Sequence, residues 1–479
     1  MVFFLTLFLA FSTFAFGAVE GWSTAVCEGL LFLGAGVMAF RHGRFLRWPE
    51  HLGGPFLAVS ALALVAALQL VPLPTALWNA VGDERAALEK NAAAADALLR
   101  SDLYRTEPFT GRLLPPDPLP TSPTAPRAWI CASFTPLLTL RALLALLAAA
   151  ALLLLLEALA QGYRDRFRKL AFAAGALGMG VGLVALVQYR PGAVKVMGLR
   201  ESTHAGASFG PFINENNGMG FVNLAFCGLY YLAGRRYLKS KRSRDRLGWA
   251  ILAAGLLAFH CTILAIRTSG AGAWTLLLVP VVASLHAMRR HPRAAMALAL
   301  VLAVCAGALV VSAVRSDFTD LHGRLPVWRD ALRGSGHWLL GNGLGSFSER
   351  FRAVLGSQPV KTPALWNYPE NEIVQLAFEG GFAGALVGLG LVAFVLALGW
   401  KAIMGSGALF ALVPALWGEA LHAMTDFHFH LWPIVTLYLL LIAIVTTGLA
   451  RQRLGPGSSR PEHRSPKRLH TGPPMRMDR

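Results

Sequence analysis

Long apolar runs alternate with short polar connections along most of the chain. A run of about 17–25 apolar residues can cross a bilayer as an α-helix, and the sequence contains about twelve such runs. They cover residues 2–19, 24–40, 54–72, 138–160, 169–189, 209–234, 248–267, 270–288, 294–314, 371–400, 405–424 and 429–450. The pattern predicts an all-α polytopic membrane domain over residues 1–450. The first run also resembles a signal sequence, but no Lys or Arg precedes Arg41, so we interpret it as a span.

Three segments depart from this alternation. Residues 73–137 combine a helical stretch with the Pro-rich "LLPPDPLPTSPTAP". Residues 315–370 form a second long polar connection, and residues 451–479 form a Pro-, Ser- and Arg-rich tail that we predict to be disordered. Connections longer than about 12–15 residues are usually functional or disordered. Turn glycines, aromatic residues and a helical pattern favour a functional role for 315–370.

The composition supports a membrane location, and the charge pattern indicates its orientation. The chain is 55% hydrophobic and only 15% charged, whereas soluble domains carry about 25% charged residues. The net charge is +18, and Lys and Arg gather in the connections after even-numbered spans and in the tail. Because basic connections stay in the cytoplasm, both termini are predicted to be cytoplasmic, and loops 73–137 and 315–370 periplasmic. We attribute the charge to this orientation and to attraction for anionic membrane lipids, and expect no nucleic-acid partner.

The five cysteines are scattered, mostly within spans, and form no CxxC pair. This arrangement predicts neither a disulfide framework nor a zinc-cysteine site.

Polar side chains that are unusual near membrane spans gather at the predicted outward ends. Ionisable residues in such places are costly and commonly functional. They are Asn214, Glu215, Asn216 and Asn217 before one span, Arg267 at the end of another, and His422, Asp426, His428 and His430 between the last two.

Each of these groups has a structural alternative. Arg267 can extend to lipid headgroups, and the asparagines can cap a helix. The histidines can be interfacial packing groups or an adventitious metal site. Asp426 and His428 are close enough in sequence to form a hydrogen-bonded pair that fixes the turn.

Loop 315–370 contains a predicted helix in "SDFTDLHGRLPVWRDALRG", with Pro326 in its first turn. Arg324 and Arg329 are candidate phosphate ligands because guanidinium groups bind phosphate oxygens in a bidentate manner, although surface charge is the alternative for both. The following "GNGLGSF" is a glycine-rich turn that allows close backbone approach.

Glu370, Asn371 and Glu372 stand where this loop enters the next span. A carboxylate at a membrane interface is suited to act as a general base. The alternative is that the negative charge stabilises the helix N-terminus.

Several of these motifs together resemble the O-antigen ligase and polymerase family of bacterial membrane proteins. The motifs are "QLVPLP", "GPFINENNGMG", "SGAGAW", "GRLPVWRDAL", "LLGNGLGSF", "ENEIVQLAFEGGFAG" and "HAMTDFHFHLWPI". The resemblance implies a GT-C-like helical glycosyltransferase with a large periplasmic loop. Such an enzyme transfers a glycan from an undecaprenyl-diphosphate-linked oligosaccharide to an acceptor glycan or lipid A core. It needs no metal or other cofactor because the lipid diphosphate is the leaving group.

The resemblance also implies roles for individual residues. Arg324, with Arg267 and Arg329, would bind the donor diphosphate, and Arg324 and Glu370 would be the catalytic pair. The residues expected to shape the site are Asn214, Asn216, Asn371, Asp426 and His428. The chain departs from the family pattern at Glu370, where many members have His, at Gly270, where many have Arg, and at Asn217 and Glu215.

The leading interpretation is therefore a polymerase or ligase of lipid-linked glycans, with a chain-length regulator and a flippase of the same pathway as candidate partners. A transporter or flippase of the lipid-linked glycan would instead need charges deep within several spans, and Glu157 and Glu419 are the main candidates. The departures from the family pattern also allow a non-catalytic scaffold of a polysaccharide assembly complex.

Overall fold

The computed structural model describes residues 1–41, 48–74, 129–161, 164–188, 195–201, 208–267, 273–288, 323–334, 337–355 and 366–453. These ranges are mostly helical, with two short two-stranded ribbons. The all-α prediction is therefore confirmed for the described part. The predicted span at 294–314, most of loop 73–137 and residues 454–479 lie outside the described residues.

Seven of the described helices are long and apolar enough to cross a membrane. They are α2 (Gly21–Arg41), α3 (Gly53–Leu70), α6 (Pro136–Ala160), α7 (Arg164–Gln188), α9 (Ser243–Arg267), α13 (Glu372–Met404) and α15 (Trp432–Arg453). Two shorter apolar helices are α1 (Val2–Phe14) and α10 (Ala273–Met288), and a third apolar stretch joins η3 (Leu409–Leu412) to α14 (Val413–His422). These helices show a polytopic membrane protein, while the total of about twelve spans stays a prediction.

Two predicted spans begin later than the apolar pattern indicated. α8 (Glu215–Lys239) starts six residues after position 209, because Asn214 caps it and the preceding residues form a turn. The run at 405–424 contains only η3 and the ten-residue α14. Gly407 has a positive φ of 88°, which a continuous helix does not accommodate. Both differences arise from glycine and capping residues within apolar sequence.

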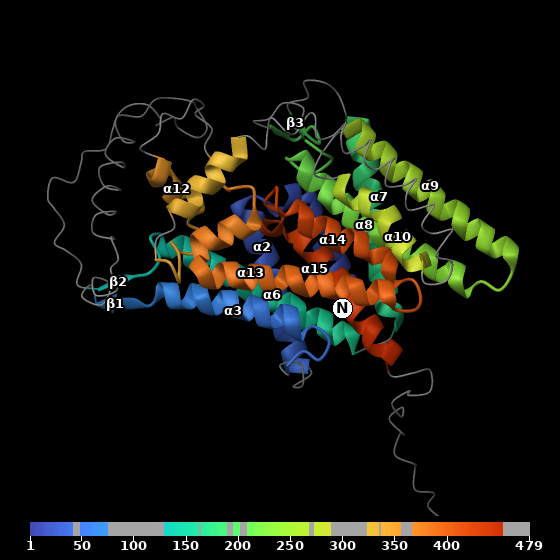
Figure 1. The fold of residues 1–479 in the computed structure, drawn as a ribbon, viewed down its shortest axis with the longest axis horizontal. Helices are drawn as coiled ribbons and strands as arrows, with labels where there is room; N and C mark the ends of the chain where they lie inside the picture. Colours follow the sequence, from blue (N-terminus) through green and yellow to red (C-terminus); the bar gives the residue numbers. More distant parts are fainter. Residues whose placement is uncertain are drawn as a thin grey trace, which may run out of the picture.

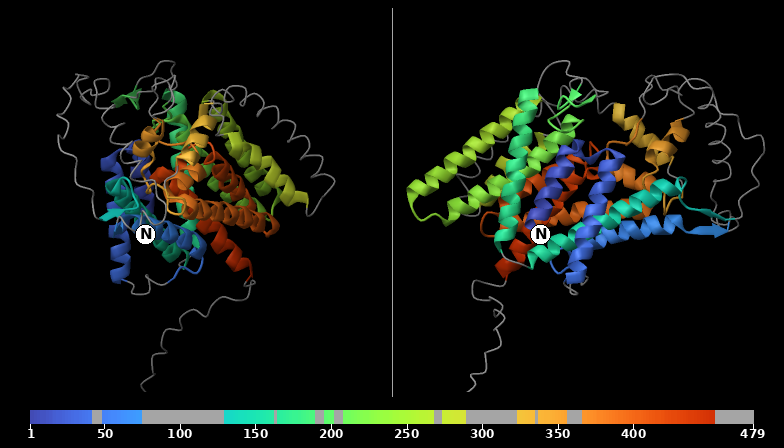
Figure 2. Two further views of the ribbon diagram at one scale, coloured as in Figure 1. Left: turned by 60° about the vertical axis from the view of Figure 1, so that its left-hand side comes forward. Right: turned by 180° about the vertical axis from the view of Figure 1, so that it is seen from behind.

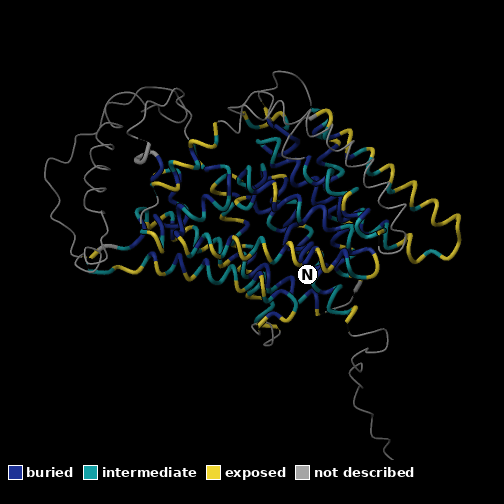
Figure 3. Tube along the Cα trace, in the orientation of Figure 1, coloured by how far each residue is buried: buried dark blue, intermediate teal, exposed yellow. Residues whose placement is uncertain are grey.

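The helices pack around a centre formed by α8 and α15. α3, α6 and α13 run alongside one another, and α9 extends outward from α8 (Figures 1 and 2). Gly178 of α7 lies so close to Ala225 of α8 that a Cβ there would overlap the alanine, as is common where small residues bring membrane helices together. Burial is deepest along α8 and α15, and α9 is mostly exposed (Figure 3). Leu247 and Ile251 on α9 are suited to contact lipid tails.

One end of the bundle is held by a buried carboxylate. The side chain of Glu157, near the end of α6, accepts hydrogen bonds from the backbone N–H groups of His51 and Leu52, each at 3.1 Å. Its other oxygen lies 2.8 Å from Nδ1 of His51. Arg451 of α15 donates to the carbonyl of Ala160 at the same end. Glu157 therefore fixes the start of α3 to the end of α6.

The His51–Glu157 pair predicts a pH-dependent stability. The hydrogen bond to Glu157 raises the pKa of His51. A raised pKa in the folded state stabilises the protein fully below the unfolded pKa of about 6.5 and loses this contribution as the pH rises through the folded pKa. The difference in Tm between the native protein and His51→Gln in detergent should therefore shrink as the pH rises above about 6.5. Glu157→Gln should remove the same pH dependence, and a difference that stays constant with pH would contradict the assignment.

The opposite end joins segments that are far apart in sequence, and we call it the site end. β1 (Pro72–Pro74) and β2 (Trp129–Cys131) pair antiparallel, so the two ends of loop 73–137 meet. Gln69, near the end of α3, donates from Nε2 to the carbonyls of Leu340 at 2.5 Å and Glu379 at 2.8 Å. Its Oε1 accepts from the N–H of Leu344 at 2.9 Å. A single buried amide thus connects α3, loop 315–370 and α13.

α13 is interrupted at Gly381, whose φ of 60° and ψ of −152° are not helical. Residues 338–343 bind the backbone groups that this break releases. Phe382 and Ala383 donate to the carbonyls of Trp338 and Leu339, at 2.8 and 3.1 Å. The N–H groups of Asn342 and Gly343 bind the carbonyls of Phe378 and Glu379, at 3.1 and 2.9 Å. Non-helical backbone at membrane depth needs such partners.

The glycine-rich turn "GNGLGSF" packs closely against α13. Gly341 has a φ of 68°, and a Cβ there would lie about 2.5 Å from the backbone of Glu379. The carboxylate of Glu379 accepts from the N–H groups of Gly345 and Phe347, both at 2.9 Å, and so caps α12 (Phe347–Leu355). The backbone of this turn was predicted to approach another group closely, and the structure shows that this group is the backbone of α13.

Candidate functional site

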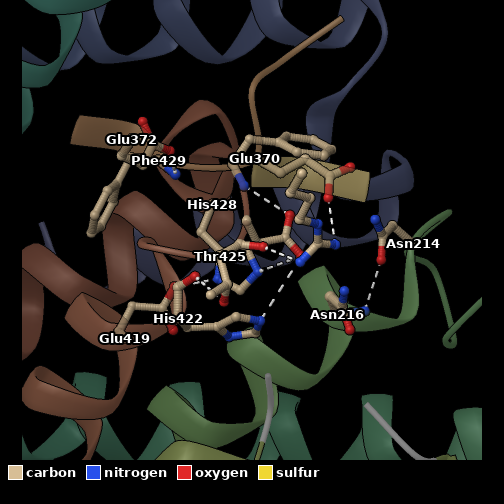
Figure 4. A network of polar contacts seen from close by, with 12 residues as sticks. Asn214, Asn216, Glu370, Glu372, Glu419, His422, Thr425, His428 and Phe429 are labelled. Carbon is tan, nitrogen blue, oxygen red and sulfur yellow. Dashed lines mark hydrogen bonds and ion pairs between the residues drawn. The ribbon is translucent and has the colours of Figure 1, made fainter. Parts of the chain in front are cut away.

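Four segments meet at the site end of the bundle (Figure 4). They are the helix over residues 323–333, residues 366–371 before α13, the turn between α14 and α15, and the start of α8. The helix predicted in loop 315–370 is present over residues 323–333, and residues 316–322 lie outside the described residues. These segments contribute many polar side chains, whereas the main core of the bundle is apolar.

Arg324 lies at the start of the helix over 323–333, and its partners include a backbone carbonyl and a carboxylate. Its Nη1 donates to the carbonyl of Thr425 at 2.7 Å, and its Nη2 forms an ion pair with Glu370. Trp328, one turn further along, donates from Nε1 to the carbonyl of Pro369 at 2.7 Å. These contacts fix the helix against the mouth of α13. The side chain of Arg324 is 13% exposed and that of Glu370 24%, so the pair is accessible from outside.

The turn at Glu370 and Asn371 is tightly constrained. Glu370 has a φ of +53°, a left-handed conformation that is uncommon for residues other than glycine. Asn371 caps α13, accepting from the N–H groups of Ile373 and Val374 at 3.0 Å each, and its Nδ2 donates to the carbonyl of Met424 at 2.9 Å. The capping alternative thus applies to Asn371, and its amide holds Glu370 in place.

Glu372 joins the same turn to the last helix pair. Its Oε1 accepts from the N–H of Phe429 at 2.9 Å, and its Oε2 lies 3.7 Å from Nε2 of His430. His430 also contacts Oε1 of Gln375 at 3.2 Å. Since Glu372 is committed to these contacts inside the bundle, Glu370 is the more accessible carboxylate.

A second group of polar side chains lies deeper, between α8, α14 and α15. Glu419 and His422 belong to α14, Asp426 to the following turn, and His428 to η4 (His428–His430). All four are at most 1% exposed. We call these four residues the buried cluster.

The predicted pairing of Asp426 with His428 is corrected by this geometry. The nearest carboxylate oxygen of Asp426 lies 3.8 Å from Nε2 of His428, beyond hydrogen-bonding distance. His428 instead contacts Glu419, with Nδ1 and Oε1 2.5 Å apart. Burial opposes protonation of His428, but the neighbouring carboxylates, Glu419 above all, outweigh it and raise its pKa. Asp426 accepts from the N–H of Phe427 at 2.8 Å and so fixes its own turn.

The start of α8 lies beside both the residues around Arg324 and Glu370 and the buried cluster. Asn214 is its N-cap, and its Oδ1 accepts from the N–H of Asn216 at 2.8 Å, so the capping alternative holds for this residue (Figure 4). Asn217 is 3% exposed. At Gly220, a Cβ would lie 2.7 Å from the ring of His428. This glycine lets α8 approach the buried cluster.

The structure brings most of the predicted site residues together. Arg324, Glu370, Asn371, Asp426, His428, Asn214 and Asn216 all lie at the site end. Arg329 differs: its side chain is 54% exposed and contacts the neighbouring Asp330 at 3.0 Å. Arg267 ends α9, and its side chain is outside the described part.

Sequence reasoning placed Glu419 only among the charges within spans and missed its contact with His428. The signal that could have revealed it is the Glu-x-x-His spacing of Glu419 and His422. Residues three apart lie on one face of a helix, and this spacing recurs in metal-binding helix bundles.

Comparison of the chain with protein-family models gives no match, and comparison with curated proteins gives none either. The fold and the site together define an all-α membrane protein with a polar centre at one end of its helical bundle.

Proposed function

We propose that the protein is a polymerase or ligase of lipid-linked glycans. It transfers an oligosaccharide from an undecaprenyl-diphosphate-linked donor to an acceptor hydroxyl, in the synthesis of O-antigen or exopolysaccharide. The observation that carries the proposal is the accessible Arg324–Glu370 pair at the mouth of α13. A guanidinium group beside a carboxylate supplies both a ligand for the departing diphosphate and a base for the acceptor.

The proposed reaction uses the two residues in turn. The acceptor oxygen forms a bond to the anomeric carbon of the donor, and the bond from that carbon to the diphosphate breaks. The diphosphate leaves with the electron pair and stays on the undecaprenyl chain, while the acceptor proton passes to the carboxylate of Glu370. Arg324 stabilises the negative charge that develops on the leaving group.

The ion pair gives this mechanism an order of events. Glu370 forms an ion pair with Arg324, so a donor diphosphate that binds Arg324 replaces Glu370 as its partner. That exchange frees the carboxylate to accept a proton, which makes donor binding a condition for activating the acceptor.

We place this site at the periplasmic face of the bacterial inner membrane. The basic connections support this orientation because they alternate with the polar ends that form the site. Twelve spans with cytoplasmic termini would result if α1, α8, α10, α14 and residues 294–314 all cross together with the seven long helices.

The transporter alternative has less support. The broken helix α13 is a feature of many transporters, but residues 338–343 fill its break. Among the described residues, Glu157 binds His51 and Leu52 at the end opposite the site, and Glu419 binds His428. The two charges are therefore committed to local contacts at separate ends and do not form a path.

Reconstitution tests the proposal directly. The purified full chain in liposomes, given an undecaprenyl-diphosphate-linked oligosaccharide and an acceptor glycan, is expected to produce a longer glycan and one free undecaprenyl diphosphate for each transfer. Movement of the donor between leaflets without release of undecaprenyl diphosphate would overturn the proposal in favour of a flippase. Neither release nor movement with a donor shown to bind would favour a scaffold and would overturn it equally.

A further inference from the structure

The buried cluster holds more polar atoms than its own contacts satisfy. Within the described part of the chain, five of its atoms have no hydrogen-bond partner: Oε2 of Glu419, both ring nitrogens of His422, Oδ2 of Asp426 and Nε2 of His428. A buried polar group without a hydrogen-bond partner is energetically costly. The hydrogen bond between Glu419 and His428 uses one atom of each, and the ring nitrogens of His422 have no hydrogen-bond partner among the described residues.

These atoms also face one another. Ligand atoms of Glu419, His422 and His428 all lie within 4.8 Å of one another. Oδ2 of Asp426 lies 3.8 Å from Nε2 of His428 and 3.9 Å from Nε2 of His422. Around a tetrahedral Zn²⁺ with bonds of about 2.0–2.2 Å, ligand atoms are roughly 3.3–3.6 Å apart. For the Asp426–histidine pairs, a contraction of a few tenths of an ångström reaches this spacing.

The contact between Glu419 and His428 fits the same arrangement. A histidine that binds a metal through one ring nitrogen commonly donates a hydrogen bond from the other to a carboxylate, which fixes the orientation of the ring. Nδ1 of His428 contacts Glu419 while Nε2 faces Asp426 and His422. Imidazole and carboxylate ligands together suit a divalent first-row transition metal.

We propose that the buried cluster binds one divalent transition-metal ion, such as Zn²⁺, through His422, His428 and Asp426, with Glu419 orienting the ring of His428. The ion fixes the turn between α14 and α15. That turn presents the carbonyl of Thr425 to Arg324 and the carbonyl of Met424 to Asn371. The ion therefore has a structural role and takes no part in the proposed transfer reaction, so the inference stands apart from the proposed function.

Metal analysis of the native full chain provides the first test. Protein purified in detergent without chelators is expected to contain about one divalent transition-metal ion per chain. After removal of the ion with a chelator, the Tm should fall and then recover on addition of Zn²⁺ alone. Binding of Co²⁺ to the stripped protein should produce the visible absorption of a tetrahedral site.

Two variants and a matched control assign the site. His422→Gln and His428→Gln should each weaken Zn²⁺ binding by about 100-fold or more, since loss of residues that merely support a metal ligand already costs about 10–100-fold. His430→Gln is the control because it removes a histidine of the same turn whose ring contacts Gln375. This control should retain the ion and the Co²⁺ absorption.

Three outcomes would overturn the proposal. One is native protein that contains no transition metal and, once treated with chelator, binds no Zn²⁺. Another is Zn²⁺ binding that persists unchanged in both cluster variants, which would assign it to histidines elsewhere. The third is a Tm that does not respond to Zn²⁺ although the ion binds. Because the first and third use only the native protein, the test stands even if a variant fails to fold.

Discussion

Arg324→Ala is expected to reduce glycan transfer by about 10²- to 10³-fold, the usual cost of removing one preorganised group that stabilises transition-state charge. The effect should fall mainly on kcat, because the charge on the diphosphate grows as the bond to the sugar breaks. The chain should still fold, since the partner left behind, Glu370, is 24% exposed and can be hydrated. Transfer by the purified variant in liposomes measures the effect.

Matched variants separate this role from surface charge. Arg333→Ala removes an exposed arginine from the same helix and should leave transfer within about twofold of the native rate, because surface charges act weakly. Arg324→Lys keeps the charge but loses the planar fork that binds phosphate, so its activity should lie between those of the alanine variant and the native protein. If the Arg324→Ala protein kept at least half the native activity, Arg324 would not be a catalytic residue. The proposed metal site would be unaffected by that result.

Gly381→Ala is expected to destabilise the protein by roughly 2–6 kcal/mol. The φ of 60° and ψ of −152° form a conformation that side chains rarely adopt, which costs about 1–3 kcal/mol. The added Cβ would lie 2.6 Å from the backbone of Gly341 and of Leu339, and such overpacking adds about 1–3 kcal/mol. Since native stability is typically 5–15 kcal/mol, low yield of folded protein or a much lower Tm should result.

Gly390→Ala is the matched control. Gly390 lies in the same helix, and a Cβ there has nothing within 4 Å. Its Tm should change little, because alanine favours a helix over glycine by only about 1 kcal/mol. If Gly381→Ala folds, hydrogen exchange should show faster exchange at the N–H groups of Phe382 and Ala383, whose partners lie in residues 338–343. Native-like Tm and exchange in Gly381→Ala would show that the break in α13 is not needed.

For some spans, the apolar pattern predicted the helix to within a few residues at each end. Residues 138–160 correspond to α6 and residues 429–450 to α15. The break in α13 could not be predicted, because an isolated glycine in a helical pattern is normally tolerated. What makes Gly381 a break is the docking of residues 338–343, a tertiary contact that no local pattern records.

At the site, too, the sequence indicated which residues are involved but not which contacts they make. The sequence located Arg324, Glu370, Asn371 and the histidines of the last turn because polar residues are costly at the ends of apolar runs. It did not determine their partners. The pairing of Asp426 with His428 was expected from proximity in the chain, whereas the contact to Glu419 depends on where α14 ends and how its last turn faces η4. Arg329 was equally plausible by residue type, but it lies on the exposed side of its helix.

The amide of Gln69 has a consequence for how the protein is assembled. Its hydrogen-bond partners at Leu340 and Glu379 follow 271 and 310 residues later in the chain. Synthesis begins at the N-terminus, so the ribosome completes α3 long before either partner exists. The last turn of α3 therefore waits, without these partners, until α13 has been made and inserted. α3 is thus made well before these contacts can form, and a nascent chain that stops before α13 would leave the end of α3 without these partners.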